Sequence, residues 1–178
     1  MKHLLKIKLL AVLLFSFSAF AVDGIAVIDM RTAVLSTQAA TDAFKALEEE
    51  STYSANLEEA QSLQAERQAI AENFEKNRET LSQDEIASMQ KEIKDKGKDL
   101  EFLAGKIQQA QEETAQRIFA ESGPSMQKII SELIQAKQIK ILLQKSENIL
   151  FSDIALDLTN DVTSMMDTAA SEDNTQSE

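Results

Sequence analysis

Short apolar runs flank a long helical stretch in this 178-residue chain. Residues 24–29 (GIAVID) are apolar at every position between the two ends of the run and rich in β-branched side chains, which is typical of a strand buried on both faces. Residues 31–38 are expected to form one or two helical turns. Towards the other end, residues 139–144 (IKILLQ) and 148–152 (NILFS) are predicted as two further short strands.

The middle of the chain predicts a long helical hairpin. Residues 41–81 contain neither glycine nor proline, and good helix formers dominate them. Ser82 followed by Glu85 is a capping-box sequence, which predicts that a second helix begins there. Apolar residues recur at heptad-like spacing on both sides of this turn, so the two helices are expected to pack as an antiparallel pair. The side chains expected to hold the pair together are Leu63, Ile70, Phe74, Ile93 and Leu103.

Forty helical residues at 1.5 Å each extend about 60 Å, so the hairpin must project from a separate base. Gly123-Pro124 predicts a kink or a break in the returning helix, which continues over residues 126–138. Residues 153–167 read as an amphipathic helix, and residues 168–178 as a disordered acidic tail. The apolar face of that helix is formed by Ile154, Leu158, Val162 and Met165.

These elements predict a mainly α fold with a small β body, from which a coiled-coil arm projects. Residues 22–40 and 139–167 form the body, and residues 41–138 form the arm. Three short strands and one terminal helix leave a sheet face and the strand edges uncovered in a single chain. We therefore expect a homo-oligomer built on the body.

The first 21 residues have the layout of a cleaved export signal. A basic segment precedes the apolar run 9–20, and Ala19 and Ala21 occupy the −3 and −1 positions of a cleavage site. A spanning helix needs about 20 apolar residues, which is more than this run offers. The mature chain is therefore expected in the periplasm.

Composition and charge narrow the function. Without residues 1–21, the chain keeps 15 basic and 30 acidic residues, a net charge of −15, so nucleic acid and strongly anionic membranes are poor partners. The chain has no cysteine, its one histidine is His3, and it contains no phosphate-binding loop. We expect no enzyme activity, no metal and no cofactor. The acidic runs 48–50 and 112–113 read as solvated helix faces, because no calcium-loop pattern surrounds them.

Three segments together resemble the Skp/OmpH family of periplasmic chaperones. They are residues 25–30 (IAVIDM), 139–144 (IKILLQ) and 149–162 (ILFSDIALDLTNDV), and the resemblance covers the mature chain to about Met166. It implies a homotrimer whose helical arms surround a cavity and hold unfolded outer-membrane proteins without ATP. The family's best-known members are basic, whereas this chain is strongly acidic, which bears on which proteins it holds. By this resemblance the trimer body is built from Ile25, Val27, Ile139, Ile141, Leu143, Ile149 and Phe151.

A chaperone of this kind needs scattered apolar contacts that an unfolded chain can use in many registers. Met89, Phe102 and Phe119 are the candidates for such contacts, with packing in the seam or body as the alternative for each. The competing function is a periplasmic coiled-coil adaptor that binds one folded partner.

Overall fold

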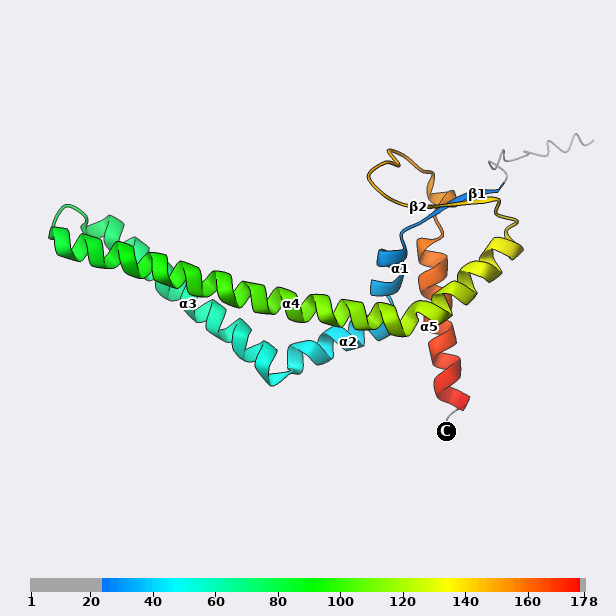
Figure 1. The fold of residues 1–178 in the computed structure, drawn as a ribbon, viewed down its shortest axis with the longest axis horizontal. Coiled ribbons are helices and arrows are strands. Elements are labelled where there is room, and N and C mark those ends of the chain that lie inside the picture. The colour runs from blue at the N-terminus through cyan, green and yellow to red at the C-terminus, as the bar shows by residue number, and fades with distance from the viewer. Residues whose placement is uncertain (1–23, 177–178) are drawn as a thin grey trace, which may run out of the picture.

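The computed structural model describes residues 24–176, with side chains as far as residue 172. The expected export signal and the last two residues lie outside the described part of the chain. The described residues form a body at one end, from which a long arm of two helices projects (Figure 1). Among residues 24–176, no helix combines the length and apolar character needed to cross a membrane.

The body contains a two-stranded parallel sheet. Strand β1 (Ile25–Ile28) pairs with β2 (Ile141–Gln144), with Ile25 opposite Ile141 and Val27 opposite Leu143. Because side chains alternate along a strand, these four residues share one face of the sheet, and Ile28 and Leu142 lie on the other. Ile28 and Leu142 belong to the hydrophobic core, so the helices cover only that second face.

The core joins the sheet to four helices, three of which supply its large buried side chains. Helix α1 (Met30–Leu35), the base of α4 (Gln83–Ala136) and α5 (Thr159–Gln176) bring segments from both ends of the chain together. Val34 and Val162 are fully buried at the centre, and Ile118, Ile129 and Leu133 of α4 pack against them. The arm and the body therefore share one continuous helix, α4.

The ascending side of the arm differs from the prediction. The helix expected over residues 41–81 is divided into α2 (Gln38–Glu49) and α3 (Ser51–Asn77), and Glu50 between them is extended, with φ −68° and ψ 128°. Helices α2 and α3 both lie along α4, but α2 also contacts α1 and α5 and places Ala40 in the core, whereas α3 follows the distal part of α4 (Figure 1). The break without glycine or proline therefore falls where the ascending chain leaves the body.

The descending side follows the sequence closely. Ser82 accepts a hydrogen bond from the Glu85 amide, and the Glu85 carboxylate accepts one from the Ser82 amide at 2.8 Å, so the capping box is confirmed. Helix α4 then continues for 54 residues with Pro124 inside it. It bends near this proline without ending (Figure 1), because proline cannot donate to the carbonyl one turn earlier. The structure thus shows a kink and not a break.

Three expectations for the last forty residues are wrong. Residues 148–152 form no strand; the segment Asp157–Leu158 occupies the second edge of β1 by bridging to Val27. The terminal helix begins at Thr159 and not at 153, since Asp153 caps only the short 3-10 turn Ile154–Leu156. The tail expected to be disordered from residue 168 is helical as far as Gln176.

Candidate functional site

The outer face of the sheet is apolar and partly uncovered, because Val27 on this face is buried but its neighbours are not. Ile141 and Leu143 remain 49% and 43% exposed on this face, and Ile25 beside them is half-buried. A sheet face of this kind is normally covered in a folded protein. It is therefore a candidate contact surface.

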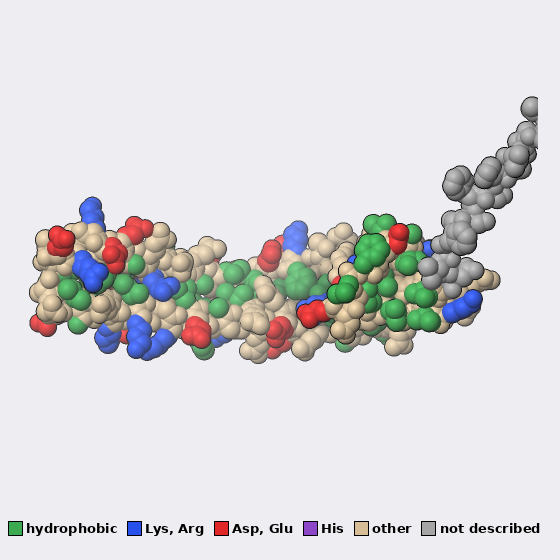
Figure 2. All heavy atoms as spheres, turned by 90° about the horizontal axis from the view of Figure 1, so that it is seen from above, with side chains coloured by type: hydrophobic (Ala, Val, Ile, Leu, Met, Phe, Trp, Pro, Cys, Tyr) green, Lys and Arg blue, Asp and Glu red, His purple; other side chains and the backbone are tan. Residues whose placement is uncertain are grey.

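A loop beside this face adds three more exposed side chains. Leu150, Phe151 and Ile154 are 96%, 85% and 86% exposed, and they lie between the end of β2 and the start of α5. Figure 2 shows hydrophobic side chains gathered on this side of the body. We call Ile141, Leu143, Leu150, Phe151 and Ile154 the body patch. Monomeric proteins rarely leave so many large apolar side chains together in water, so the patch is a candidate interaction site.

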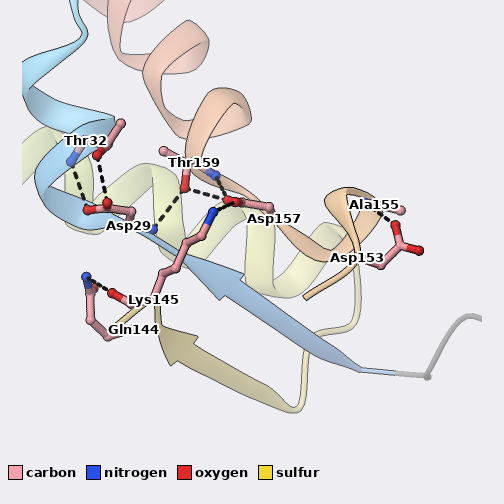
Figure 3. A network of polar contacts seen from close by, with 8 residues as sticks. All are labelled: Asp29, Thr32, Gln144, Lys145, Asp153, Ala155, Asp157 and Thr159. Atoms are coloured by element: carbon pink, nitrogen blue, oxygen red, sulfur yellow. Dashed lines mark hydrogen bonds and ion pairs between the residues drawn. The ribbon is translucent and has the colours of Figure 1, made fainter. Parts of the chain in front are cut away.

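Polar contacts fix both ends of the loop that carries Leu150, Phe151 and Ile154 of the body patch (Figure 3). The Lys145 ammonium group lies 2.8 Å from the Asp157 carboxylate, which also accepts a hydrogen bond from the Thr159 amide. The Thr159 hydroxyl in turn accepts a hydrogen bond from the Asp29 amide at 2.9 Å. The Asp29 carboxylate caps α1 through Thr32. One network therefore joins β1, α1, α5 and the loop.

Two carboxylates and one ammonium group carry the charges of this network. Burial acts to raise the pKa of Asp157, but the hydrogen bonds from Lys145 and Thr159 outweigh it, so this pKa is lowered. The pKa of Lys145 is raised by its hydrogen bond to Asp157 and by the charge of that carboxylate. The pKa of Asp29 is lowered, chiefly by its hydrogen bonds from Thr32. All three groups are charged at neutral pH, so the ion pair is intact there.

The arm exposes apolar surface along its whole length. Between Ser51 and Ala110 the only buried apolar side chains are Tyr53 and Leu103. The other seam residues are only half-buried, because a pair of helices covers each seam residue from one side alone. They are Leu63, Ile70, Phe74, Leu81, Ile86, Met89, Ile93, Leu100 and Ile107. The arm thus offers a long, discontinuous apolar surface.

Phe102 is the most exposed large apolar residue of the arm. It is 64% exposed, and the Lys106 ammonium group lies 4.6 Å from the centre of its ring. A cation over an aromatic face is an attractive contact, but it leaves most of this ring in water. The ring is therefore free to contact another molecule.

A family model for "Outer membrane protein (OmpH-like)" matches residues 24–166, which is most of the chain and nearly all of its described part. The chain belongs to the OmpH-like family. Among curated proteins, no sequence matches it significantly.

Four chains of solved structures match this OmpH-like chain. One of them is the crystal structure at 2.83 Å resolution of a candidate outer membrane chaperone (OmpH-like) from Caulobacter crescentus CB15. The match has 18% sequence identity and a TM-score of 0.45, and it covers 82% of this chain and 85% of the other. The family assignment rests on the family model alone.

The seven residues expected to build the OmpH-like body occupy three environments. Ile141, Leu143 and Phe151 lie in the body patch, whereas Ile25, Ile139 and Ile149 are half-buried and Val27 is buried within the single chain. Leu150 and Ile154 were missed. The first lies between two residues that were expected to alternate on a strand, and the second was placed on the apolar face of a helix that begins later.

The three arm residues singled out from the sequence also differ. Phe102 is exposed as expected, Met89 is half-buried in the seam, and Phe119 is half-buried and packs against the body core. The network of Asp29, Lys145, Asp157 and Thr159 was missed as well. A capping pattern at Asp157 and Thr159 was the one available signal for it.

The described part of the chain offers no group of three or more His, Cys, Asp or Glu side chains placed to hold a metal ion. The acidic run 48–50 lies at the bend between α2 and α3 and is exposed to solvent. Its exposure fits the solvated helix face that its sequence indicates.

Proposed function

We propose that this OmpH-like chain is an ATP-independent holdase chaperone of the periplasm. In this proposal several copies associate through their bodies, and their arms enclose a cavity. The cavity holds unfolded outer-membrane proteins, here called clients, and keeps them from aggregating. Family membership supports a role linked to outer-membrane proteins.

The half-buried seam of the arm is the observation that carries the proposal. A holdase must offer weak apolar contacts to many different sequences and must release each of them. A row of partly exposed Leu, Ile, Met and Phe side chains meets this need, because none forms a deep pocket that selects one shape. Met89 and Phe102 are the proposed client contacts with the most suitable chemistry, since Met surfaces adapt to different partners and Phe102 is exposed. Phe119 packs against the core, so only the exposed part of its ring is available to contact a client.

The body patch supports association of the bodies. Its five large apolar side chains lie on the side of the sheet that no helix covers. A second copy of the same chain presents an identical apolar patch and fits such a surface. We take three copies from the resemblance to the family; the patch itself argues for an oligomer of unspecified size.

The distribution of charge bears on how a client approaches. Residues 54–110 of the arm carry 8 basic and 12 acidic residues, a net charge of −4. The rest of the chain after residue 21 carries 7 basic and 18 acidic residues, a net charge of −11. Most of the net negative charge therefore lies outside residues 54–110, and salt screens it beyond about 10 Å. Apolar contact, not charge attraction, drives binding in this proposal.

A binding comparison tests the proposal. One outer-membrane β-barrel protein is offered to the chain in two forms, unfolded in dilute urea and folded in detergent, and an unrelated unfolded protein is offered beside it. We expect micromolar or tighter binding of both unfolded chains and none of the folded barrel. Binding of a single folded partner, with no affinity for unfolded chains, would instead identify a periplasmic adaptor.

A further inference from the structure

The loop that carries the exposed side chains of the body patch is closed at its base by the backbone. The Lys145 amide donates to the Ile28 carbonyl at 2.7 Å, and the Leu158 amide donates to the Val27 carbonyl at 2.9 Å. Consecutive carbonyls of a strand point to opposite edges, so the loop leaves along the β2 edge of β1 and returns along its other edge. The two ends of the loop therefore flank the last residues of β1.

Side chains reinforce the same point. The Lys145 ammonium group crosses the base of the loop to Asp157, and Asp157 is itself fixed by Thr159 (Figure 3). Asp157 is only 16% exposed, whereas Lys145 is 47% exposed. The carboxylate thus forms a fixed anchor on the body, and the lysine is the part that spans the loop.

Away from its base the loop has few fixed contacts. Its inner hydrogen bonds are local, from the Ile149 amide to Ser146 and from the Ala155 amide to Asp153. Ile149, Ser152 and Leu156 are half-buried, whereas Leu150, Phe151 and Ile154 are at least 85% exposed and make almost no contact within the chain. The position of these three exposed side chains therefore depends strongly on the base of the loop.

We propose that the ion pair between Lys145 and Asp157 is a clasp that holds the loop ready for association, so that both are positioning residues for the body interface. This inference rests on the proposed association of bodies through the body patch. Ordering a loop during association weakens binding, because the lost conformational freedom opposes it. A loop ordered beforehand avoids that loss and presents Phe151 in one place.

The test uses Lys145→Met, which removes the charge but keeps a similar length and leaves the Thr159 contacts of Asp157 in place. Lys145→Arg keeps the charge and serves as the rescue. Lys137→Met is the matched control, because Lys137 forms a comparable ion pair with Asp161, at 3.0 Å and with 49% and 46% exposure, and neither residue belongs to the loop.

Loop order is read first. The chain has no tryptophan, so Phe151→Trp places a single fluorophore in the loop. With Ile141→Asp added to keep the chains apart, we expect lower Trp fluorescence anisotropy with Lys145→Met than with Lys137→Met or Lys145→Arg. Equal anisotropy in all three would overturn the clasp, whether or not the chain associates.

Association is read second, by sedimentation equilibrium with Ile141 and Phe151 intact. We expect Lys145→Met to weaken association about five- to tenfold relative to Lys137→Met, while the urea midpoint of unfolding stays the same in both. Equal association constants would overturn the role in assembly. A wild-type chain that is monomeric at all concentrations would refute the proposed oligomer, and the anisotropy result would still decide whether the clasp orders the loop.

Discussion

The side-chain amide of Gln111 donates a hydrogen bond to the hydroxyl of Tyr53 at 2.8 Å, which ties α4 to α3 just beyond the break at Glu50. Tyr53 is the buried residue of α3, in a helix whose other apolar side chains are at most half-buried. This contact therefore holds α3 against α4 at the base of the arm, directly after the break between α2 and α3.

Removing the Tyr53 ring should loosen the arm. We expect Tyr53→Ala to lower the free energy of unfolding by about 3 kcal/mol, since it leaves a cavity between two helices. Tyr53→Phe keeps the ring and should cost about 1 kcal/mol, the value of one hydrogen bond. Urea denaturation followed by circular dichroism measures both; equal losses would show that the hydrogen bond, not the packing, fastens the arm.

Ile141→Asp tests the body patch. It places an unpaired charge in the apolar interface that we propose, so the oligomer should dissociate into folded single chains. Light scattering gives the mass, and circular dichroism confirms that the helices remain. Asn148→Asp adds the same charge at an exposed polar site of the neighbouring loop and should leave the mass unchanged. An oligomer that survives Ile141→Asp would place the interface elsewhere.

Phe102→Ala tests the arm as a binding surface. Because the ring is 64% exposed, its removal should change the free energy of unfolding by less than about 0.5 kcal/mol. Release of a bound client should nevertheless become faster, which stopped-flow fluorescence of a labelled client measures. Leu103→Ala, at the buried neighbouring position, should instead cost about 2–4 kcal/mol of stability. A large loss of stability from Phe102→Ala would show that Phe102 is part of the packed structure.

How far the sequence predicts this structure depends on whether the deciding interaction is local. The capping box at Ser82 and the kink at Pro124 follow from backbone chemistry within one helical turn, and both are present. The break at Glu50 has no such signal, because it falls where the chain leaves contacts with α1 and α5 that are distant in sequence. The strand expected at 148–152 is absent because the chain leaves the sheet after Gln144, and the next segment to return, at Asp157, bridges the second edge of β1.

The same distinction between local and long-range interactions applies to the candidate site. Exposure of Phe102 could be inferred from its place beside the seam residue Leu103. The ion pair between Lys145 and Asp157 could not, because it depends on the course of an irregular loop of eleven intervening residues. Sequence periodicity carries no information about such a closure.

Acid should destabilise the body through Asp29 and Asp157. Both have a pKa lowered in the folded chain from an ordinary value of 3.8. A carboxyl whose pKa is lower in the folded state adds stability above the unfolded value and loses it as the pH falls through the folded value. We therefore expect these two groups to add no pH dependence to the free energy of unfolding between pH 7 and 5, and a loss below about pH 4. Urea titrations at each pH measure this, and Asp157→Asn should show a smaller loss than the wild type. An identical acid dependence in both proteins would contradict the assignment to Asp157.

Suppression of aggregation tests the central claim most directly. A denatured outer-membrane β-barrel protein is diluted into buffer with the chain lacking residues 1–21, without ATP, at low and at high salt, and light scattering is followed. We predict suppression at both salt concentrations, because half-buried apolar residues of the arm provide the contact and most of the net negative charge lies outside residues 54–110. Undiminished aggregation at both salt concentrations, with a chain shown to be folded and oligomeric, would contradict the holdase function.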